Sequence, residues 1–150
     1  MVDIGDKAVT KRRAVASARV KMRPDVAESI ATGTVSKGDV LAAARLAGIL
    51  ASKRTAELIP LCHPVQTTLA TVDFELDAAR GEVFVRAAVE AVDRTGVEME
   101  ALVAASVAAL TIYDMIKGAD RWATLEAIRL EEKRGGKSGV VTRPSTPGPR

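Results

Sequence analysis

Hydrophobic and polar residues alternate in four stretches of the chain, and such alternation is typical of a strand with one buried face. The stretches are residues 13–22, 65–78, 82–92 and 124–133. In the first of them, apolar residues share one face: Ala14, Ala16, Ala18, Val20 and Met22. A turn near Arg80–Gly81 separates the second stretch from the third, so we expect these two to form a β-hairpin.

Two helices are expected between the first and second strands. Pro24 suits the first turn of a short helix, and Gly33 suits its end. A longer helix is expected from about Asp39, whose carboxylate can accept amide hydrogen bonds at the helix start, to about Leu58. Pro60 helps to end it, because the residue before a proline disfavours helical geometry.

A further helix is expected from Thr95 to about Lys117. Thr95 and Glu98 have the spacing of a capping box, and Gly118 follows the predicted end. Its many alanines indicate close packing, either on the sheet of this chain or against a helix of another subunit. The order of strand, helices, strand, strand, helix and strand predicts an α+β fold of the ferredoxin-like βαββαβ type, a sandwich of an antiparallel sheet with helices on one face.

The composition is that of a folded domain. The chain has 150 residues, of which 47% are hydrophobic and 27% are charged. We expect one domain over residues 1–139 and a flexible C-terminal tail over residues 140–150. Aromatic residues make up only 3%, which argues against an RNA-binding sheet that stacks bases. Cys62 is the only cysteine and His63 the only histidine, which excludes an internal disulfide, a cage of cysteines and a His-rich zinc site.

The formal net charge is +3, and its distribution matters more than its size. Residues 133–150 include five basic and no acidic residues. Removing these five from the 22 basic residues leaves 17 in the rest of the chain, against 19 acidic residues. A body so close to neutral argues against nucleic-acid binding, but it permits the capture of a phosphorylated small molecule. No signal peptide is visible in the sequence and no apolar stretch reaches membrane-spanning length, so we expect a soluble, cytoplasmic protein that does not bind membranes.

Two residues of the last predicted helix are candidates for chemistry. Asp114 and Lys117 stand three residues apart and share one helix face. They form either an ordinary surface ion pair or an acid/base pair in which each group tunes the proton affinity of the other. Glu100 lies 14 residues before Asp114, within about 40° of its direction but about 21 Å away along the axis. One ligand reaches both only if it is long, or if a second subunit brings another copy of these residues.

Three loop segments carry further candidates. The first is Leu61-Cys62-His63, where His63 either is structural or handles a phosphate or a proton. Cys62 has no second histidine to act as its base, which argues against nucleophilic catalysis. Lys37 stands just before a helix start, which is either an anion site or a plain turn. The glycine-rich basic run 134–139 lacks the spacing of a Walker motif, and either wraps a phosphate or is a solvated tail.

The long motifs at residues 37–40, 53–64 and 95–115 resemble the cyclic pyranopterin monophosphate synthase family, the molybdenum cofactor biosynthesis protein C or MoaC family. The resemblance covers nearly the whole chain. It implies a lyase that converts a cyclised dihydro-GTP intermediate, 3′,8-cyclo-7,8-dihydroguanosine triphosphate, to cyclic pyranopterin monophosphate with release of pyrophosphate, by general acid/base catalysis. It also implies a ferredoxin-like subunit and a homohexamer, built as a trimer of dimers, with sites between subunits.

The resemblance also implies roles for individual residues. It places the catalytic groups at Asp114, Lys37 and Lys117. It places substrate contacts at Leu61, Cys62, His63, Glu98, Met99, Glu100, Arg12 and Lys133. Lys137 is a further candidate cation for the triphosphate. Arg13 stands where the family usually has an acidic residue, which leaves the local partner of Arg12 open.

No cofactor and no metal site is expected, although Mg²⁺ can accompany a triphosphate. The alternative function is that of a non-catalytic, nucleotide-binding oligomeric regulatory domain, whose pockets would bind the same ligand without consuming it.

Overall fold

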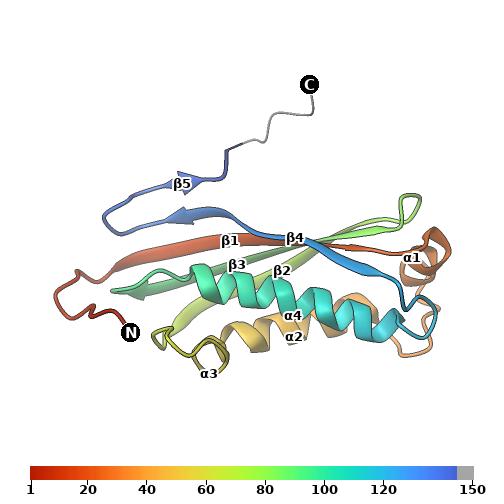
Figure 1. The fold of residues 1–150 in the computed structure, drawn as a ribbon, viewed down its shortest axis with the longest axis horizontal. Coiled ribbons are helices and arrows are strands. Elements are labelled where there is room, and N and C mark those ends of the chain that lie inside the picture. Colours follow the sequence, from red (N-terminus) through yellow and green to blue (C-terminus); the bar gives the residue numbers. More distant parts are fainter. Residues whose placement is uncertain (145–150) are drawn as a thin grey trace.

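Helices cover one face of an antiparallel sheet in the computed structural model, which describes residues 1–144 (Figure 1). The strands are β1 (Thr10–Lys21), β2 (Thr67–Asp77), β3 (Glu82–Asp93), β4 (Thr124–Arg134) and β5 (Val141–Thr142). The helices are α1 (Pro24–Ala31), α2 (Val40–Ser52), α3 (Thr55–Leu58) and α4 (Glu98–Ile116). The elements up to β4 follow the predicted order.

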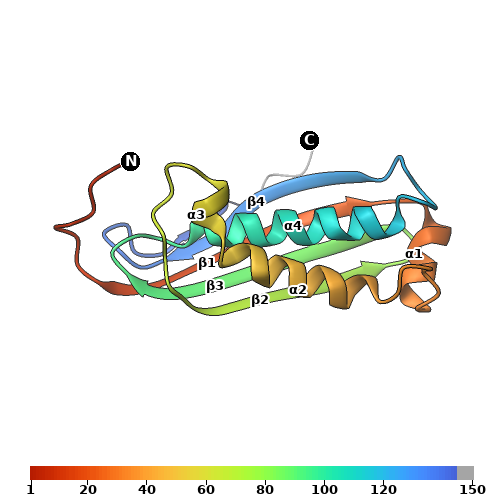
Figure 2. The same ribbon diagram turned by 90° about the horizontal axis from the view of Figure 1, so that it is seen from below.

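The sheet has five strands in the order β2-β3-β1-β4-β5, and each neighbouring pair is antiparallel. The predicted hairpin of β2 and β3 is confirmed, and it turns at Gly81, whose φ of +67° suits a glycine. Figure 2 shows α2 and α4 side by side on one face of the sheet. This arrangement confirms the expected ferredoxin-like α+β fold.

The core lies between the sheet and the two long helices. The apolar face predicted for β1 is confirmed, since all five of its residues are at most 6% exposed. The alanines of α4 that face the core are fully buried: Ala101, Ala104, Ala105, Ala108 and Ala109. A Cβ on Gly48 of α2 would lie 2.8 Å from the carbonyl oxygen of Ala104, so small residues let the two helices approach closely. By length and composition alone α4 could span a membrane, but half of its apolar stretch is buried, as in a core helix.

The second predicted helix is broken in two. α2 ends at Ser52, and the short α3 begins at Thr55. The Ser52 hydroxyl donates to the carbonyl of Ile49, and the Thr55 hydroxyl donates to the carbonyl of Ser52. Serine and threonine hydroxyls that bond to nearby carbonyls compete with helical hydrogen bonding, which accounts for the break.

The predicted capping box of α4 is wrong. The helix begins at Glu98, and Val97 occupies the N-cap position without a side-chain hydrogen bond. Val97 is 1% exposed, so hydrophobic packing holds this end of α4. At the other end of the chain, β5 was not predicted: Val141 and Thr142 pair with β4 inside the segment expected to be a tail. Residues 145–150 of that segment lie outside the described residues.

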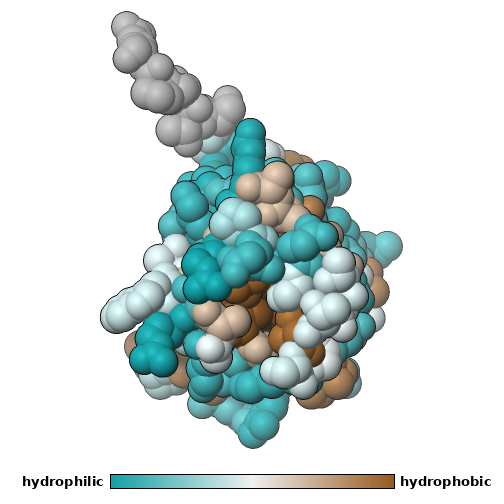
Figure 3. Space-filling view, turned by 90° about the vertical axis from the view of Figure 1, so that its right-hand side faces the viewer, coloured by the Kyte–Doolittle hydropathy of each residue, from teal (hydrophilic) through white to brown (hydrophobic). Residues whose placement is uncertain are grey.

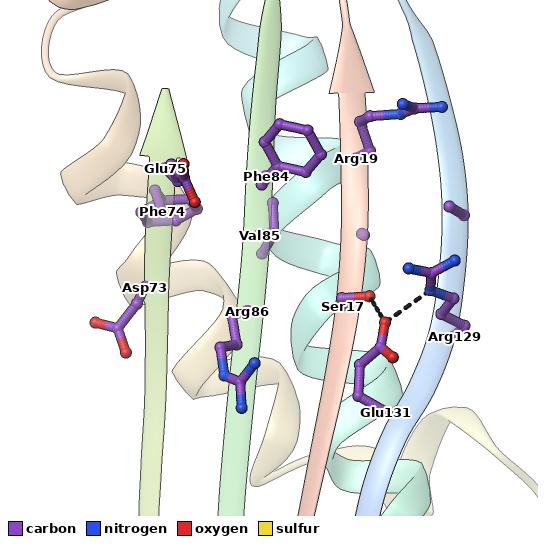
Figure 4. A pocket seen from close by; sticks show the side chains of 12 residues that line it. Ser17, Arg19, Asp73, Phe74, Glu75, Phe84, Val85, Arg86, Arg129 and Glu131 are labelled. Carbon is purple, nitrogen blue, oxygen red and sulfur yellow. Dashed lines mark hydrogen bonds and ion pairs between the residues drawn. The ribbon is translucent and has the colours of Figure 1, made fainter. Parts of the chain in front are cut away.

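The other face of the sheet is polar and carries a shallow cavity of about 510 Å³ (Figure 4). Arg129 and Ser17 both donate to the same oxygen of Glu131, at 2.7 and 2.5 Å. Arg86 and Asp73 lie on the neighbouring strands β3 and β2 and balance each other in charge. Both signs of charge therefore alternate over this face.

Candidate active site

α4 carries candidate residues at both of its ends. Its first turn holds Glu98, Met99 and Glu100, its last turn holds Asp114, and Lys117 follows it. The 14 residues from Glu100 to Asp114 span about 21 Å of helix. The described chain therefore has two separate groups of candidate residues.

The first group is the lysine–aspartate cluster, which consists of Lys37, Asp114 and Lys117. Lys37 Nζ donates to Asp114 Oδ2 at 2.8 Å and to the backbone oxygen of Asp114 at 2.7 Å. Lys117 Nζ lies 2.7 Å from Asp114 Oδ1, so each carboxylate oxygen has its own ammonium partner. The three side chains are 46–55% exposed, which leaves them open to a ligand. α4 ends near α1 (Figure 1), and the face of the molecule at that end shows hydrophilic residues around a small hydrophobic hollow (Figure 3).

The charges of this cluster follow from its geometry. The hydrogen bond from Lys117, and then the one from Lys37, lower the pKa of Asp114 from 3.8 to about 2. The hydrogen bond and the charge of Asp114 in turn raise the pKa of Lys117. Asp114 is therefore a carboxylate near neutral pH and a very weak base. It can orient two ammonium groups, and its charge favours the protonated form of Lys117.

The second group lines a cationic cavity of about 960 Å³, which we define by Arg12, Arg94, Lys133 and Lys137. Arg12 donates through Nε to the carbonyl of Asp93 at 3.1 Å and through Nη2 to the carbonyl of Arg94 at 3.0 Å. These bonds hold a guanidinium at the cavity wall without neutralising it, because its partners are uncharged. A cavity lined by such groups suits an anionic ligand with several phosphates.

Two consecutive glycines shape the wall of this cavity. Gly135 and Gly136 have φ values of +99° and +71°. A Cβ on Gly135 would overlap the carbonyl oxygen of Lys11, and one on Gly136 would overlap the guanidinium of Arg12. The glycines therefore let the chain turn against β1, and they bring Lys133 and Lys137 to the same cavity as Arg12. Lys133 Nζ is hydrogen-bonded to the hydroxyl of Ser138.

The Leu61–His63 segment lies beside the N-terminal end of α4. Leu61 is 70% exposed, whereas Cys62 and His63 are half-buried. The Cys62 thiol donates a long hydrogen bond of 3.9 Å to Glu100 Oε1. Burial raises the pKa of Cys62, and the hydrogen bond that the thiol donates to Glu100 acts in the same direction, so the thiol is a poor nucleophile at neutral pH.

The structure places many of the predicted site residues in one or the other of the two groups. Lys37 joins the Asp114–Lys117 pair although it is 77 residues away from Asp114. Arg12, Glu98, Lys133 and Lys137 line one cavity. Cys62 and Glu100 contact each other, and Glu100 is not among the residues that line the cationic cavity. Met99 stands between the two glutamates, half-buried.

The sequence analysis missed Arg94 and three residues of the N-terminal segment that also line the cavity, Asp3, Asp6 and Lys7. Arg94 stands next to Thr95–Gly96, just before a helix start, and that position is a signal for anion binding. Its guanidinium is hydrogen-bonded to the carbonyl of Gly5, which ties the N-terminal segment to the cavity.

The unusual Arg13 does not disturb Arg12. Neighbouring residues of a strand point to opposite faces, and Arg13 forms an ion pair with Glu90 at 2.5 Å. Arg12 bonds to backbone carbonyls instead. Each arginine thus has its own partners.

Within residues 1–144, no group of three or more His, Cys, Asp and Glu side chains gathers in a way that could hold a metal ion. The carboxylates that line the cationic cavity are those of Asp3, Asp6 and Glu98. An Mg²⁺ that arrives with a triphosphate would draw most of its ligands from the phosphates and from water.

Comparison with known proteins gives one consistent result. The family model described as the MoaC family matches residues 1–136. The cyclic pyranopterin monophosphate synthase of Pelobacter propionicus is 55% identical over 143 residues, which cover 95% of this chain and 89% of that protein. The proteins of the same name from Chloroflexus aurantiacus and Geobacter sulfurreducens are 56% and 55% identical, and the matches cover 96% and 95% of this chain and 88% and 89% of those proteins.

Proposed function

The chain belongs to the MoaC family, and from that premise we propose that it is a cyclic pyranopterin monophosphate synthase of molybdenum cofactor biosynthesis. Its substrate would be the cyclised dihydro-GTP intermediate, and its products would be cyclic pyranopterin monophosphate and pyrophosphate. The observation that carries the proposal is the identity of about 55% with synthases over nearly the whole chain.

The lysine–aspartate cluster supports a lyase reaction by general acid/base catalysis. Opening one ring, building another and closing a cyclic phosphate each require protons to move. Lys117 has a raised pKa and would donate a proton to the substrate. Lys37 shares the Asp114 carboxylate at 2.8 Å and is the second acid/base candidate. Asp114 would orient both ammonium groups without exchanging a proton itself, because its pKa is about 2.

The cationic cavity supports binding of the triphosphate. Arg12, Lys133, Lys137 and Arg94 supply four cations around one cavity. Arginine presents several N–H donors in a fixed fork, and lysine adds a mobile charge, so the two together suit a chain of phosphates. Glu98 lines the same cavity and would accept hydrogen bonds from N–H groups of the substrate's nucleobase. Mg²⁺ bound to the triphosphate remains a prediction.

We further propose a homohexamer, a trimer of dimers, whose sites lie between subunits. The cavity and the cluster lie at opposite ends of α4, about 21 Å of helix apart, so a second copy is the simplest source of the missing half. The outer surface of the helix layer also exposes leucines that a neighbouring subunit could cover: Leu46, Leu50 and Leu110 are 51–61% exposed. The expected location is the cytoplasm, with neither nucleic acid nor a membrane as partner.

A turnover assay tests the function. Purified protein is mixed with the cyclised dihydro-GTP intermediate, and pyrophosphate and pterin product are followed. The Lys37→Ala and Asp114→Asn variants should lose activity by about 10²–10⁴-fold, the usual contribution of a positioned acid/base group. Lys21→Ala, an exposed lysine at the end of β1, is the matched control and should retain normal rates. Near-normal turnover of either cluster variant would remove that residue from the mechanism.

Complementation tests the shared site. Lys37→Ala and Arg12→Ala each damage a different half, so hexamers that contain both kinds of subunit should include intact sites. Unfolding and refolding the two inactive proteins together should restore activity, whereas each refolded alone should stay inactive. A mixture without recovered activity would mean that one chain supplies both halves. Binding of the intermediate without turnover by the unmodified protein would favour the non-catalytic regulatory domain.

A further inference from the structure

Glu100 is a buried acid without a counter-charge. Its side chain lies in the first turn of α4, and the residue is 2% exposed. Oε1 accepts the long hydrogen bond of 3.9 Å from the Cys62 thiol. Oε2 is buried and has no hydrogen-bond partner among residues 1–144. Buried carboxylates are normally paired or fully hydrogen-bonded, so this group requires an explanation.

The surroundings of Glu100 are acidic. Glu98 lies on the same helical turn, and Asp93 ends β3 beside it. Arg12 lies at the same end of the sheet, but its guanidinium donates to the backbone carbonyls of Asp93 and Arg94. Burial, followed by the charges of Glu98 and Asp93, raises the pKa of Glu100, while the thiol of Cys62 and the backbone oppose this only in part.

The two protonation states differ in what they leave unsatisfied. A neutral carboxylic acid leaves one buried O–H unpaired and can still accept the thiol hydrogen bond on its carbonyl oxygen. An ionised carboxylate would leave a full negative charge buried, with only the Cys62 thiol and its own backbone N–H in its favour and with two acidic neighbours. The second state costs far more free energy than the first, because the desolvation of a charge greatly exceeds that of a hydroxyl.

We propose that Glu100 is held as a neutral carboxylic acid in the folded chain, with its proton on Oε2, and that in this form it positions the Leu61–His63 segment through the Cys62 thiol. Glu100 is a positioning residue because it contacts Cys62 of the Leu61–His63 segment while its own oxygens are shielded from solvent. Ionisation would replace a neutral acceptor by a buried charge at the thiol and displace the segment.

The neutral form of Glu100 also suits the proposed function, because it avoids repulsion of a bound triphosphate. This one consequence rests on the proposed function. A triphosphate in the nearby cationic cavity brings several negative charges to the end of α4 that already holds Glu98 and Asp93. An uncharged Glu100 avoids one further repulsion there. The acid itself is a property of the ligand-free chain, so its test is separate from that of the reaction.

The first experiment compares the unfolding of the wild type and Glu100→Gln in urea at pH 5–8, without ligand and at one protein concentration. The folded pKa of Glu100 is raised above its ordinary value of 4.5, so the native state holds a proton that the unfolded state releases. The wild type must therefore lose stability as the pH rises from about 4.5 to the folded pKa. Glutamine resembles the neutral acid and cannot ionise. The folding constant of the wild type relative to the variant should fall by up to about tenfold per pH unit in this window.

Glu126→Gln is the control with the opposite sign. Hydrogen bonds from Thr124 and Arg19 lower the pKa of Glu126. The wild type should therefore keep its advantage over this variant at neutral pH and lose it only in acid. A ratio of folding constants for wild type and Glu100→Gln that stays constant from pH 5 to pH 8 would show that Glu100 is ionised throughout, and would overturn the proposal.

The second experiment uses His63 as a probe of position. Because His63 is the only histidine, its ring signals in ¹H–¹³C spectra can be assigned directly. At pH 6, Glu100→Gln should retain the wild-type ring shifts, whereas Glu100→Ala, which removes the acceptor of the Cys62 thiol, should move them. If Glu100 only filled space, the His63 ring shifts of the wild type and of Glu100→Gln would not differ in a pH-dependent way. Ring shifts that are equal in these two proteins at every pH would therefore exclude the positioning role. If the Gln variant does not fold, the infrared band of a protonated carboxylic acid in the folded wild type at pH 6 decides the protonation state, and its absence overturns the proposal.

Discussion

Gly48→Ala should destabilise the protein, although the same change in most helices is stabilising. Gly48 lies in the middle of α2, where alanine has a helix propensity about 1 kcal/mol more favourable than glycine. A Cβ at this position would lie 2.8 Å from the backbone oxygen of Ala104 and 3.0 Å from a Val72 methyl group. The backbone of α4 cannot move away without shifting its packing on the sheet. Overpacking of this kind costs about 1–3 kcal/mol.

The net effect is the difference between these two magnitudes, a loss of about 1 kcal/mol of unfolding free energy. Urea unfolding of both proteins at equal concentration measures it, with Gly118→Ala as control because nothing lies within 4 Å of a Cβ there. Since α4 carries Asp114 of the cluster and Glu98 of the cavity wall, the variant should also lose turnover through the displacement of that helix. A variant more stable than the wild type by about 1 kcal/mol, the pure propensity effect, would refute the close approach of α2 and α4.

Two further predictions concern charge and backbone strain. The lysine–aspartate cluster should stabilise the wild type over Asp114→Asn at and above the ordinary aspartate pKa of 3.8. This advantage should disappear as the pH falls through the folded pKa of about 2. An advantage of the wild type that persists in unfolding experiments at pH 2 would contradict the ion pairs. Ala127→Gly should raise the unfolding free energy by about 1 kcal/mol, because glycine avoids the strain of a left-handed conformation. Ala127 has a φ of +51° and lies in an exposed part of β4. A melting temperature of the variant below that of the wild type would contradict this prediction.

Local patterns were sufficient for the strands and for most of the helices. The alternation of Ala14, Ala16, Ala18 and Val20 predicts the buried face of β1, because strand side chains alternate strictly. The break between α2 and α3 depends on Ser52 and Thr55 hydroxyls that bond to carbonyls, and many helices tolerate such residues. The short strand β5 depends on pairing with β4, which its own two residues do not encode.

The candidate site divides in the same way. The Asp114–Lys117 pair follows from helical spacing alone. Lys37 and Arg94 come from loops, and their partners are set by how the chain returns on itself. Two consecutive glycines, Gly135 and Gly136, indicate a turn in the sequence. They do not indicate that this turn packs against Lys11 and Arg12. The contacts of Gly135 and Gly136 with Lys11 and Arg12 come from the three-dimensional structure alone.

The antiparallel arrangement of α2 and α4 explains why the chain has one group of candidate residues at each end. Lys37 precedes α2 and contacts Asp114 in the last turn of α4, whereas Cys62 follows α3 and contacts Glu100 in the first turn. In a ferredoxin-like fold both helices cross from one end of the sheet to the other, so the loops that flank one helix must meet opposite ends of the other. Once the fold is recognised, the proximity of Lys37 to Asp114 can therefore be predicted. The same geometry keeps the lysine–aspartate cluster away from the cationic cavity within one chain, and it is the reason why we propose that a ligand that needs both lies between two copies.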